Sequence, residues 1–341
     1  MLYCRAGFEG ECAQEISAIA SAREVYGHVR AQRDQAYVEF VAQGVRAAKL
    51  DTSLPTLIFA RQCLALIAQL HDLPAADRVT PILAALREHG ERYADVLVES
   101  PDTNEGKALA PFCRSFGNAL RGAMKSARLL DAAAPRRLHA FFPQSGKVYL
   151  CTGNVITSSP WPQGIPRLKF PREAPSRSTL KLDEAFLVLL DETERARWLQ
   201  SGMSAVDLGA APGGWTWQLV RRGLSVIAVD NGPMDAALMD SGQVVHARED
   251  GFRYRPKKPV DWLVCDMVEQ PRRVAALMAQ WFSERRCQRA VFNLKLPMKK
   301  RWEETQLCLS ILRDALGADA DIRARQLYHD REEITVFAQA R

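Results

Sequence analysis

Long hydrophobic runs are missing from the 341-residue sequence. No apolar run approaches the roughly 20 residues that span a bilayer. The first residues lack a basic head followed by an apolar stretch, so we expect no signal peptide and a cytoplasmic location. Internal repeats and low-complexity tracts are also absent. Hydrophobic residues at 47% and charged residues at 25% exclude a disordered chain, a collagen-like fibre and a coiled coil.

Cysteine pairs are missing as well. The eight cysteines are scattered along the chain, with no CxxC pair and no dense framework. A zinc site or a disulfide scaffold does not fit this pattern. We therefore expect buried, reduced thiols and no bound metal.

The sequence has no large excess of charge of either sign, since the net charge of the whole chain is only +6. One segment differs: between Arg114 and Arg177 there are eleven Lys or Arg residues and two acidic ones, a local charge of +9. A basic segment on a nearly neutral chain is typical of a nucleic-acid surface, although a solvated connector has the same composition. The charge pattern therefore favours a nucleic-acid partner.

The N-terminal residues alternate between short apolar runs and helical patterning. Runs at Val25–Val29 and Tyr37–Val41 predict strands. Periodicity at Glu11–Ala22 and Gln43–Lys49 predicts helices. This rhythm indicates a small α+β module over residues 1–52.

A second module is expected over residues 53–155. The patterning predicts three helices, at Leu57–Leu70, Thr80–His89 and Phe112–Lys125, and a strand at Ala94–Glu99. In the helix that starts at Thr80, this residue is expected to be the N-cap and Gly90 to end the helix.

Prolines recur between Pro135 and Pro175, too often for a continuous helix. We interpret this stretch as a connector that contains one short strand, Lys147–Thr152. A domain boundary is expected near Leu150–Pro160, with the linker itself at residues 156–175.

The remaining residues, 176–341, change character. Strand-like apolar runs alternate with helical patterns, which indicates a parallel sheet covered on both faces. The strands are expected at Ser204–Leu208, Ser225–Val229, Val244–Ala247, Trp262–Cys265 and Ala290–Leu294, and the helices at Trp215–Arg222, Pro271–Glu284 and Glu303–Leu316. Two last runs, Ile322–Leu327 and Glu333–Ala338, predict an antiparallel pair. A parallel sheet that ends in such a pair is typical of the class I (Rossmann-like) methyltransferase, an α/β fold.

A glycine-rich loop is the sharpest local signal. Asp207–Trp215 follows the first strand of this sheet and opens a helix, a context that suits close approach of a ligand to the backbone. Its spacing is neither that of a dinucleotide loop nor that of a P-loop. Asp230 ends the next strand, about 20 residues on, where a carboxylate can bind ribose hydroxyls, and Asp250 could reach an adenine amine. These features favour bound S-adenosyl-L-methionine over a purely structural turn.

Charged residues also follow the fourth and fifth strands. Asp266 and Lys295 should lie together at the carboxyl edge of the sheet, and Lys181 lies on a helix ahead of the first strand. A ribose 2′-OH must lose its proton as the methyl group arrives, and a neutral lysine can take it. The reference pKa of lysine is about 10.4, and we expect a second cation and partial burial to lower it.

Two adjacent glutamates are candidates for a fourth charged group of this site. Glu332 and Glu333 are adjacent, so on a strand they face opposite sides and only one can enter the site. The two are near even, and Glu332 is taken here. The neighbouring His329 is interpreted as a turn residue.

Two other functions remain open. A pyrimidine C5-methyltransferase would use Cys265 as a nucleophile, but no Pro-Cys dipeptide is present, and Cys265 should point away from Asp266 on a regular strand. A catalytically silent rRNA-binding assembly factor would not need Lys181, Asp266 and Lys295. An adenine amino-methylating enzyme is disfavoured because no Asn/Asp-Pro-Pro-aromatic cluster occurs at the fourth strand.

Long motifs of the second half closely resemble the bacterial 23S ribosomal RNA (cytidine 2′-O) methyltransferase M family. They are Gly164–Pro171, Ser176–Lys181, Asp207–Trp217, Asp230–Met234, Arg248–Phe252, Cys265–Glu269, Phe292–Lys300 and Ala324–Glu333. The first 150 residues resemble the family more loosely; there the family carries a ferredoxin-like piece and a THUMP RNA-binding domain.

The resemblance implies ribose methylation of one cytidine in the peptidyl-transferase region of 23S rRNA, with S-adenosyl-L-methionine as donor. Cofactor contacts are implied for Ser178, Ala211, Pro212, Gly213, Gly214, Asp230, Asp250 and Asp266. Lys295 would be the proton acceptor, and Lys181 matches the first lysine of related ribose methyltransferases that use a lysine–aspartate–lysine–glutamate set. Ala211 departs from the family, where some members have cysteine.

The partner expected is free or early-assembly 23S rRNA, because an RNA-binding groove suits exposed RNA better than a finished ribosome. We expect a monomer.

Overall fold

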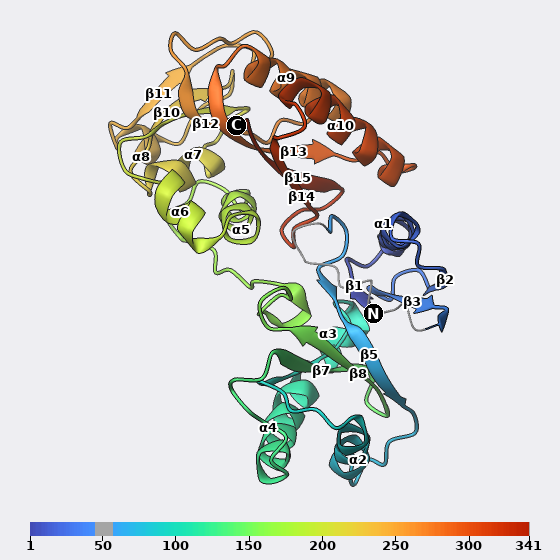
Figure 1. The fold of residues 1–341 in the computed structure, drawn as a ribbon. Helices are drawn as coiled ribbons and strands as arrows, with labels where there is room; N and C mark the ends of the chain where they lie inside the picture. The colour runs from blue at the N-terminus through green and yellow to red at the C-terminus, as the bar shows by residue number, and fades with distance from the viewer. Residues whose placement is uncertain (45–56, 341) are drawn as a thin grey trace. The chain divides into compact units, whose positions relative to one another are not determined.

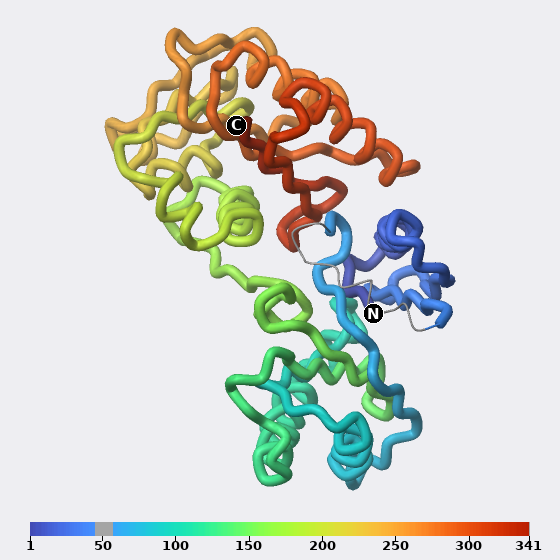
Figure 2. The backbone as a smooth tube through the Cα atoms, viewed as in Figure 1, coloured from blue at the N-terminus to red at the C-terminus, as the bar shows by residue number. Residues whose placement is uncertain are grey.

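The computed structural model describes residues 1–44 and 57–340 (Figure 1). The chain forms two compact units, Met1–Pro166 and Arg167–Arg341, and passes once from the first to the second (Figure 2). The boundary between the units falls inside the connector expected at residues 156–175. The boundary expected between residues 52 and 53, and most of the helix expected at Gln43–Lys49, lie outside the described residues.

The first unit begins with a small antiparallel sheet of order β2-β3-β1-β4, covered by one helix. Its elements are β1 (Leu2–Tyr3), α1 (Glu9–Ala22), β2 (Gly27–Ala31), β3 (Tyr37–Ala42) and β4 (Gln62–Cys63). The buried Glu15 of α1 accepts backbone N–H bonds from Ile58, Phe59 and Ala60. These bonds fix the chain just before β4, which places the last strand of this sheet beyond residue 52.

A second sheet, of order β5-β8-β7-β6, completes the first unit. Its elements are β5 (Ala65–Leu70), α2 (Val79–His89), β6 (Val96–Glu99), α3 (Asn104–Ala108), α4 (Ala110–Ser126), β7 (Arg136–Gln144) and β8 (Lys147–Asn154), followed by a 3₁₀ turn, η3 (Pro162–Gly164). Helices α2 and α4 bury Ile82, Leu86, Leu120 and Met124 against it. An aromatic cluster joins the two sheets of this unit, with the ring centroids of Tyr3 and Phe141 4.7 Å apart.

The helix expected at Leu57–Leu70 is wrong. These residues form β4 and β5, and β5 pairs with β8 from Ala65 opposite Thr152 to Leu70 opposite Val148. Leucine and alanine favour a helix locally, but the sheet partner, far along the chain, decides the conformation.

The first part of the expected connector is also wrong, because Arg136–Asn154 forms the β7–β8 hairpin at the centre of the second sheet. Pro135 precedes β7, and Pro143 lies where the β7–β8 register shifts, between Phe141 and Gln144. Neither proline removes a ladder hydrogen bond, so the strand tolerates both.

Helix α2 starts one residue earlier than expected. It begins at Val79, and the Asp77 carboxylate, rather than Thr80, accepts the backbone N–H bonds of Val79 and Thr80. Gly90 ends the helix in the left-handed conformation, as predicted.

The second unit contains a seven-stranded sheet of order β11-β10-β9-β12-β13-β15-β14. Its strands are β9 (Ser204–Leu208), β10 (Ser225–Val229), β11 (Val244–Ala247), β12 (Val260–Cys265), β13 (Cys287–Lys295), β14 (Asp321–Arg325) and β15 (Glu333–Gln339). Strands β9 to β13 run parallel, and β15 is antiparallel to both β13 and β14. The expected α/β class I methyltransferase sheet is confirmed.

Helices cover both faces of this sheet, with α5, α6 and α7 on one and α9 and α10 on the other (Figure 1). The helices are α5 (Thr179–Leu189), α6 (Glu192–Trp198), α7 (Gly214–Val220), α8 (Ala236–Met239), α9 (Pro271–Ser283) and α10 (Arg301–Leu316). Under α5 to α7 lies a core that includes Phe186, Trp198, Trp262 and Phe337. This core fixes the strands, whose carboxyl ends therefore hold the following loops in place.

All eight cysteines lie in the described part of the chain; each is a free thiol, and all but Cys63 are buried. Among residues 1–44 and 57–340, no helix combines the length and the apolar character needed to cross a bilayer.

Candidate active site

Four charged side chains meet at the carboxyl edge of the seven-stranded sheet. They come from α5 (Lys181), the end of β12 (Asp266), the end of β13 (Lys295) and the start of β15 (Glu333). Asp266 lies 3.2 Å from Lys181 Nζ and 2.5 Å from Lys295 Nζ. Glu333 bridges the same two lysines, at 2.5 Å from Lys181 and in direct contact with Lys295. The result is a closed ring in which two ammonium groups alternate with two carboxylates.

Sheet register explains this meeting. Lys295 and Glu333 are direct partners in the antiparallel β13–β15 pair, so their side chains leave the sheet on the same face. Asp266 follows β12, the parallel neighbour of β13. Lys181 is supplied by α5, which packs over β14 and β15.

The ring is shielded but not sealed. The side chains of Lys181, Asp266 and Lys295 are 18%, 15% and 22% exposed, and that of Glu333 is 5% exposed. A substrate can therefore reach the lysines. Glu333 is too deeply buried for that, and it contacts the two lysines from the protein side.

The expected lowering of the Lys295 pKa is wrong for the protein alone. Burial does act to lower it, but the charges of Asp266 and Glu333 and their hydrogen bonds outweigh burial and raise the pKa. Lys295 is therefore an ammonium group at neutral pH.

Glu332 lies outside the ring, which corrects the choice made from the sequence. Its carboxylate is 2.5 Å from Arg301, and its side chain is 60% exposed. Strand β15 begins at Glu333, and successive side chains on a strand point to opposite faces, so the glutamate that faces the lysines is Glu333.

Asn293 is a site residue that the sequence analysis missed. Its Nδ2 donates to Asp266 Oδ1 at 2.8 Å, and its Oδ1 accepts from Thr335 Oγ1 at 2.7 Å. Thr335 in turn contacts Asp330, whose pKa is raised well above its ordinary value by burial. One polar residue in the otherwise apolar run Ala290–Leu294 was the available signal, because a buried amide needs partners.

The glycine-rich loop between β9 and α7 is shaped by close approaches. Gly209 and Gly213 have φ angles of +75° and +117°, which disfavour side chains. A Cβ at Gly209 would lie 2.5 Å from Met267, and one at Gly214 would lie 2.3 Å from the hydroxyl of Ser178. Ser178 therefore stands against the first turn of α7.

A cavity of about 440 Å³ opens beside this loop. Its lining includes Gly209, Ala211, Asp230, Asp250, Gly251, Phe252, Asp266, Met267 and Val268. Of the predicted cofactor residues, Ala211, Asp230, Asp250 and Asp266 line it, whereas Ser178, Pro212, Gly213 and Gly214 do not. Asp266 belongs to both the cavity and the charged ring, so the two features form one site.

Asp230 is held rigidly at this cavity. Its Oδ2 accepts from the backbone N–H of Ala211 at 3.0 Å, and its Oδ1 accepts from that of Gly232 at 2.7 Å. Each oxygen keeps a further lone pair for a ligand hydroxyl. Asp250 is more open: its side chain is 52% exposed, and its Oδ1 accepts the backbone N–H of Phe252 at 2.9 Å.

Cys265 is fully buried in β12, and burial raises its pKa to about 12. It is not among the residues that line the cavity. The thiol is therefore protonated and enclosed, which does not suit a nucleophile.

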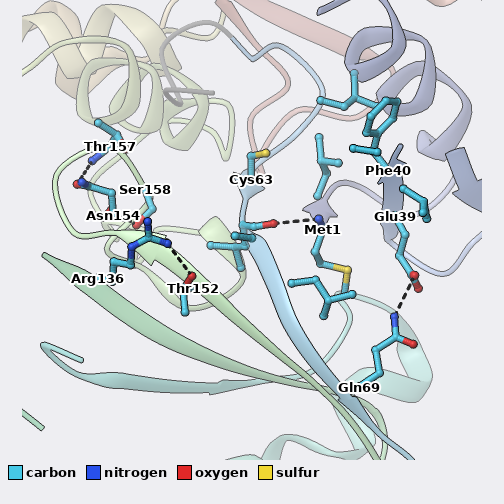
Figure 3. A pocket seen from close by; sticks show the side chains of 18 of the residues that line it. Met1, Glu39, Phe40, Cys63, Gln69, Arg136, Thr152, Asn154, Thr157 and Ser158 are labelled. Carbon is cyan, nitrogen blue, oxygen red and sulfur yellow. Dashed lines mark hydrogen bonds between the residues drawn. The ribbon is translucent and has the colours of Figure 1, made fainter. Parts of the chain in front are cut away.

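A second cavity, of about 660 Å³, lies in the first unit (Figure 3). It is lined from both sheets, and four of its polar residues are already bonded to one another: Arg136 donates to Thr152 at 3.3 Å, and Gln69 donates to Glu39 at 3.3 Å. None of the predicted site residues lines it.

Three family models match the chain. They are the "RlmM ferredoxin-like domain" over residues 1–64, "Ribosomal RNA large subunit methyltransferase M, N-terminal" over residues 77–153 and "FtsJ-like methyltransferase" over residues 174–302.

Curated relatives match over nearly their whole length. The "Ribosomal RNA large subunit methyltransferase M" of Xanthomonas oryzae pv. oryzae (strain PXO99A) is 53% identical over 343 residues, covering 99% of this chain and 98% of that protein. The protein of the same name from Xanthomonas axonopodis pv. citri (strain 306) is 52% identical with the same coverage. Among solved structures, TrmN from Thermus thermophilus is 12% identical with a TM-score of 0.34, covering 100% of this chain and 98% of that chain.

Proposed function

The chain belongs to the ribosomal RNA large subunit methyltransferase M family, and from this we propose that it methylates the ribose 2′-OH of a cytidine in 23S rRNA. That the protein is an rRNA methyltransferase follows from the family. The donor that we propose is S-adenosyl-L-methionine.

The ring of Lys181, Asp266, Lys295 and Glu333 beside the cavity carries this proposal. A sugar hydroxyl is a weak nucleophile, so its methylation needs a base that removes the proton. Lys295 is the candidate base, because its Nζ is reachable and is held from two sides by Asp266 and Glu333. Lys181 balances the second negative charge of the ring and keeps both carboxylates in place.

The residues around the cavity fit the proposed donor. Gly209 lines the cavity, and a Cβ there would lie 2.5 Å from Met267, so the loop backbone passes close to the cavity without a side chain at this position. Asp230 would bind the ribose hydroxyls of the donor, and Asp250 its adenine amine. When bound, S-adenosyl-L-methionine supplies a methyl group on a positively charged sulfur, which suits a cavity lined by carboxylates.

The first unit is the part we assign to RNA binding, with a THUMP-like domain at about residues 53–155. From the basic segment, Arg114, Lys125 and Arg128 are exposed on or next to α4. Arg121 and Arg136 instead lie near the carboxylates of Asp95 and Glu91. We propose free or early-assembly 23S rRNA as the substrate and a monomeric enzyme.

The direct test is methyl transfer from labelled S-adenosyl-L-methionine to unmodified, protein-free 23S rRNA, followed by mass spectrometry of the nucleosides. We expect 2′-O-methylcytidine. A base-methylated nucleoside would overturn the proposed chemistry. Transfer only to assembled large subunits would overturn the proposed substrate but not the chemistry.

Loss of Asp230 should weaken donor binding selectively. Asp230→Ala is expected to raise the Kd for S-adenosyl-L-methionine about tenfold or more, since a hydrogen bond to a charged group contributes roughly 1.5–3 kcal/mol. The Kd is measured by calorimetry, and Asp240→Ala, an exposed aspartate of the same region, is the control. An unchanged Kd for Asp230→Ala would remove this residue from the donor site.

Cys265→Ala is expected to keep methyl transfer to RNA within about twofold of the wild type, because a thiol with a pKa of about 12 supplies almost no thiolate at neutral pH. Initial rates at saturating donor and RNA measure this. A Cys265→Ala protein that is folded but inactive would instead support the alternative of a pyrimidine C5-methyltransferase with Cys265 as nucleophile.

A further inference from the structure

The loop between β13 and α10 carries side chains that the chemistry of the site does not use. Met298 is 91% exposed, which makes it, with Val268, the most exposed large apolar side chain of the second unit's described residues. Val268 lines the donor cavity, but Met298 does not. Lys299 and Lys300, which follow Met298, are exposed as well.

This loop lies within reach of the reacting hydroxyl. Met298 is three residues beyond Lys295, so their Cα atoms are at most about 11 Å apart along a fully extended chain. The base of a nucleotide is attached to the ribose carbon next to the one that bears the 2′-OH, and the 3′-phosphate is attached to the carbon on the other side. When the 2′-OH of a nucleotide lies at Lys295, its base and its flanking phosphates are therefore close enough to be contacted by side chains of this loop.

Charge indicates from which side RNA approaches. The lining of the donor cavity includes Asp230, Glu249, Asp250 and Glu269, which repel phosphates. The β13–α10 loop offers the opposite sign, since Lys299 and Lys300 are exposed and neither forms an ion pair within the described part of the chain. The RNA backbone is therefore favoured along the β13 side of the edge, and the donor along the β10 side.

We propose that Met298 packs against the base of the nucleotide being methylated, while Lys299 and Lys300 bind its flanking phosphates. This inference rests on the proposed function, because it places the ribose at Lys295. A thioether side chain is flexible and polarisable, so it can cover an unstacked base without demanding one base identity. Sequence-specific recognition of single-stranded RNA commonly splays bases out of their stack, and an exposed apolar side chain beside the reacting ribose can cover such a base.

The phosphate contacts are tested with a double variant, K299A/K300A. RNA binding is measured by fluorescence anisotropy with a fragment of 23S rRNA and no methyl donor, at several salt concentrations. We expect the slope of log K against log salt to fall by about 1.4, since each phosphate contact on single-stranded RNA contributes about 0.7. The matched control is K257A/K258A, an exposed lysine pair that precedes β12 at the opposite edge of the sheet. Equal slopes for the two double variants would overturn this part.

The base contact is tested with Met298→Ala on two synthetic RNA fragments, one with the target cytidine and one with an abasic ribose at that position. We expect kcat/KM to fall about fivefold or more on the first and to stay unchanged on the second. Met298→Leu should restore most of the loss, and Val245→Ala, an exposed apolar residue of β11, is the control. Equal losses on both fragments, or no loss on either, would overturn the proposal. Failure of this inference can be told from failure of the proposed function. The methylated product of the wild-type protein tests the function alone, and the anisotropy measures RNA binding without any methylation.

Discussion

Lys295→Met is expected to lower the rate of methyl transfer at least about 10³-fold and to leave the Kd for S-adenosyl-L-methionine within about threefold. General base catalysis contributes roughly 10²–10⁴ in rate, and Lys295 is the group best placed to supply it. Lys295 does not line the donor cavity, so donor binding should survive. Single-turnover transfer to 23S rRNA measures the rate, and calorimetry measures the Kd.

Lys295→Arg separates a base from a mere positive charge. Arginine keeps the charge and can contact Asp266 and Glu333, but it does not deprotonate in proteins. If Lys295 acts as the base, the arginine variant should be as inactive as the methionine variant. Lys258→Met, at the opposite edge of the sheet, is the control and should keep full activity. An arginine variant with more than about a tenth of the wild-type rate would reduce Lys295 to an electrostatic role.

The pH dependence of the wild type follows from the same residue. The pKa of Lys295 is raised in the protein alone, because Asp266 and Glu333 outweigh the effect of burial. Only the neutral amine can take a proton, and below the pKa its fraction grows tenfold per pH unit. The single-turnover rate should therefore rise with pH through the neutral range, with a slope near one on a logarithmic scale. If methyl transfer itself limits the rate and the profile is nevertheless flat, Lys295 need not lose its proton before the reaction.

The second half of the chain was predictable because its signals are local. Each of its five parallel strands is a short apolar run, and the loop from Asp207 to Trp215 carries its own glycine pattern. The first half was less predictable because distant pairing decides it. Residues Ala65–Leu70 become a strand only because β8, far along the chain, lies beside them.

The site shows the same division between local and distant causes. Lys181, Asp266 and Lys295 could be named because each lies on or directly next to an element that the sequence makes recognisable. The choice between Glu332 and Glu333 could not, since it depends on a single residue of register between β13 and β15. Asn293 was missed because its role appears only when β12 brings Asp266 beside it.

That register leads to the second large effect. Glu333→Gln is expected to lower the rate of methyl transfer about 10²-fold, whereas Glu332→Gln should stay within about twofold of the wild type. The two glutamates are neighbours, and the substitution is the same. Glu333 accepts from both lysines and is almost fully enclosed, whereas Glu332 contacts Arg301 at the surface.

The chemical reason is that an amide has one donor end and one acceptor end, so Gln at position 333 would turn an N–H group toward an ammonium group. One lysine would keep only Asp266 as its partner, and a partly buried cation that loses one of two carboxylates shifts position or loses its proton more readily. The rate is measured under single-turnover conditions, with thermal unfolding of both variants as a check that each is folded. Loss of the Glu333 charge also removes one of the causes that raise the Lys295 pKa, so the rising limb of the pH profile should move to lower pH. Equal rates for the two variants would contradict a specific role of Glu333 beside Lys295. A loss confined to Glu332→Gln would mean that β15 shifts its register when RNA binds.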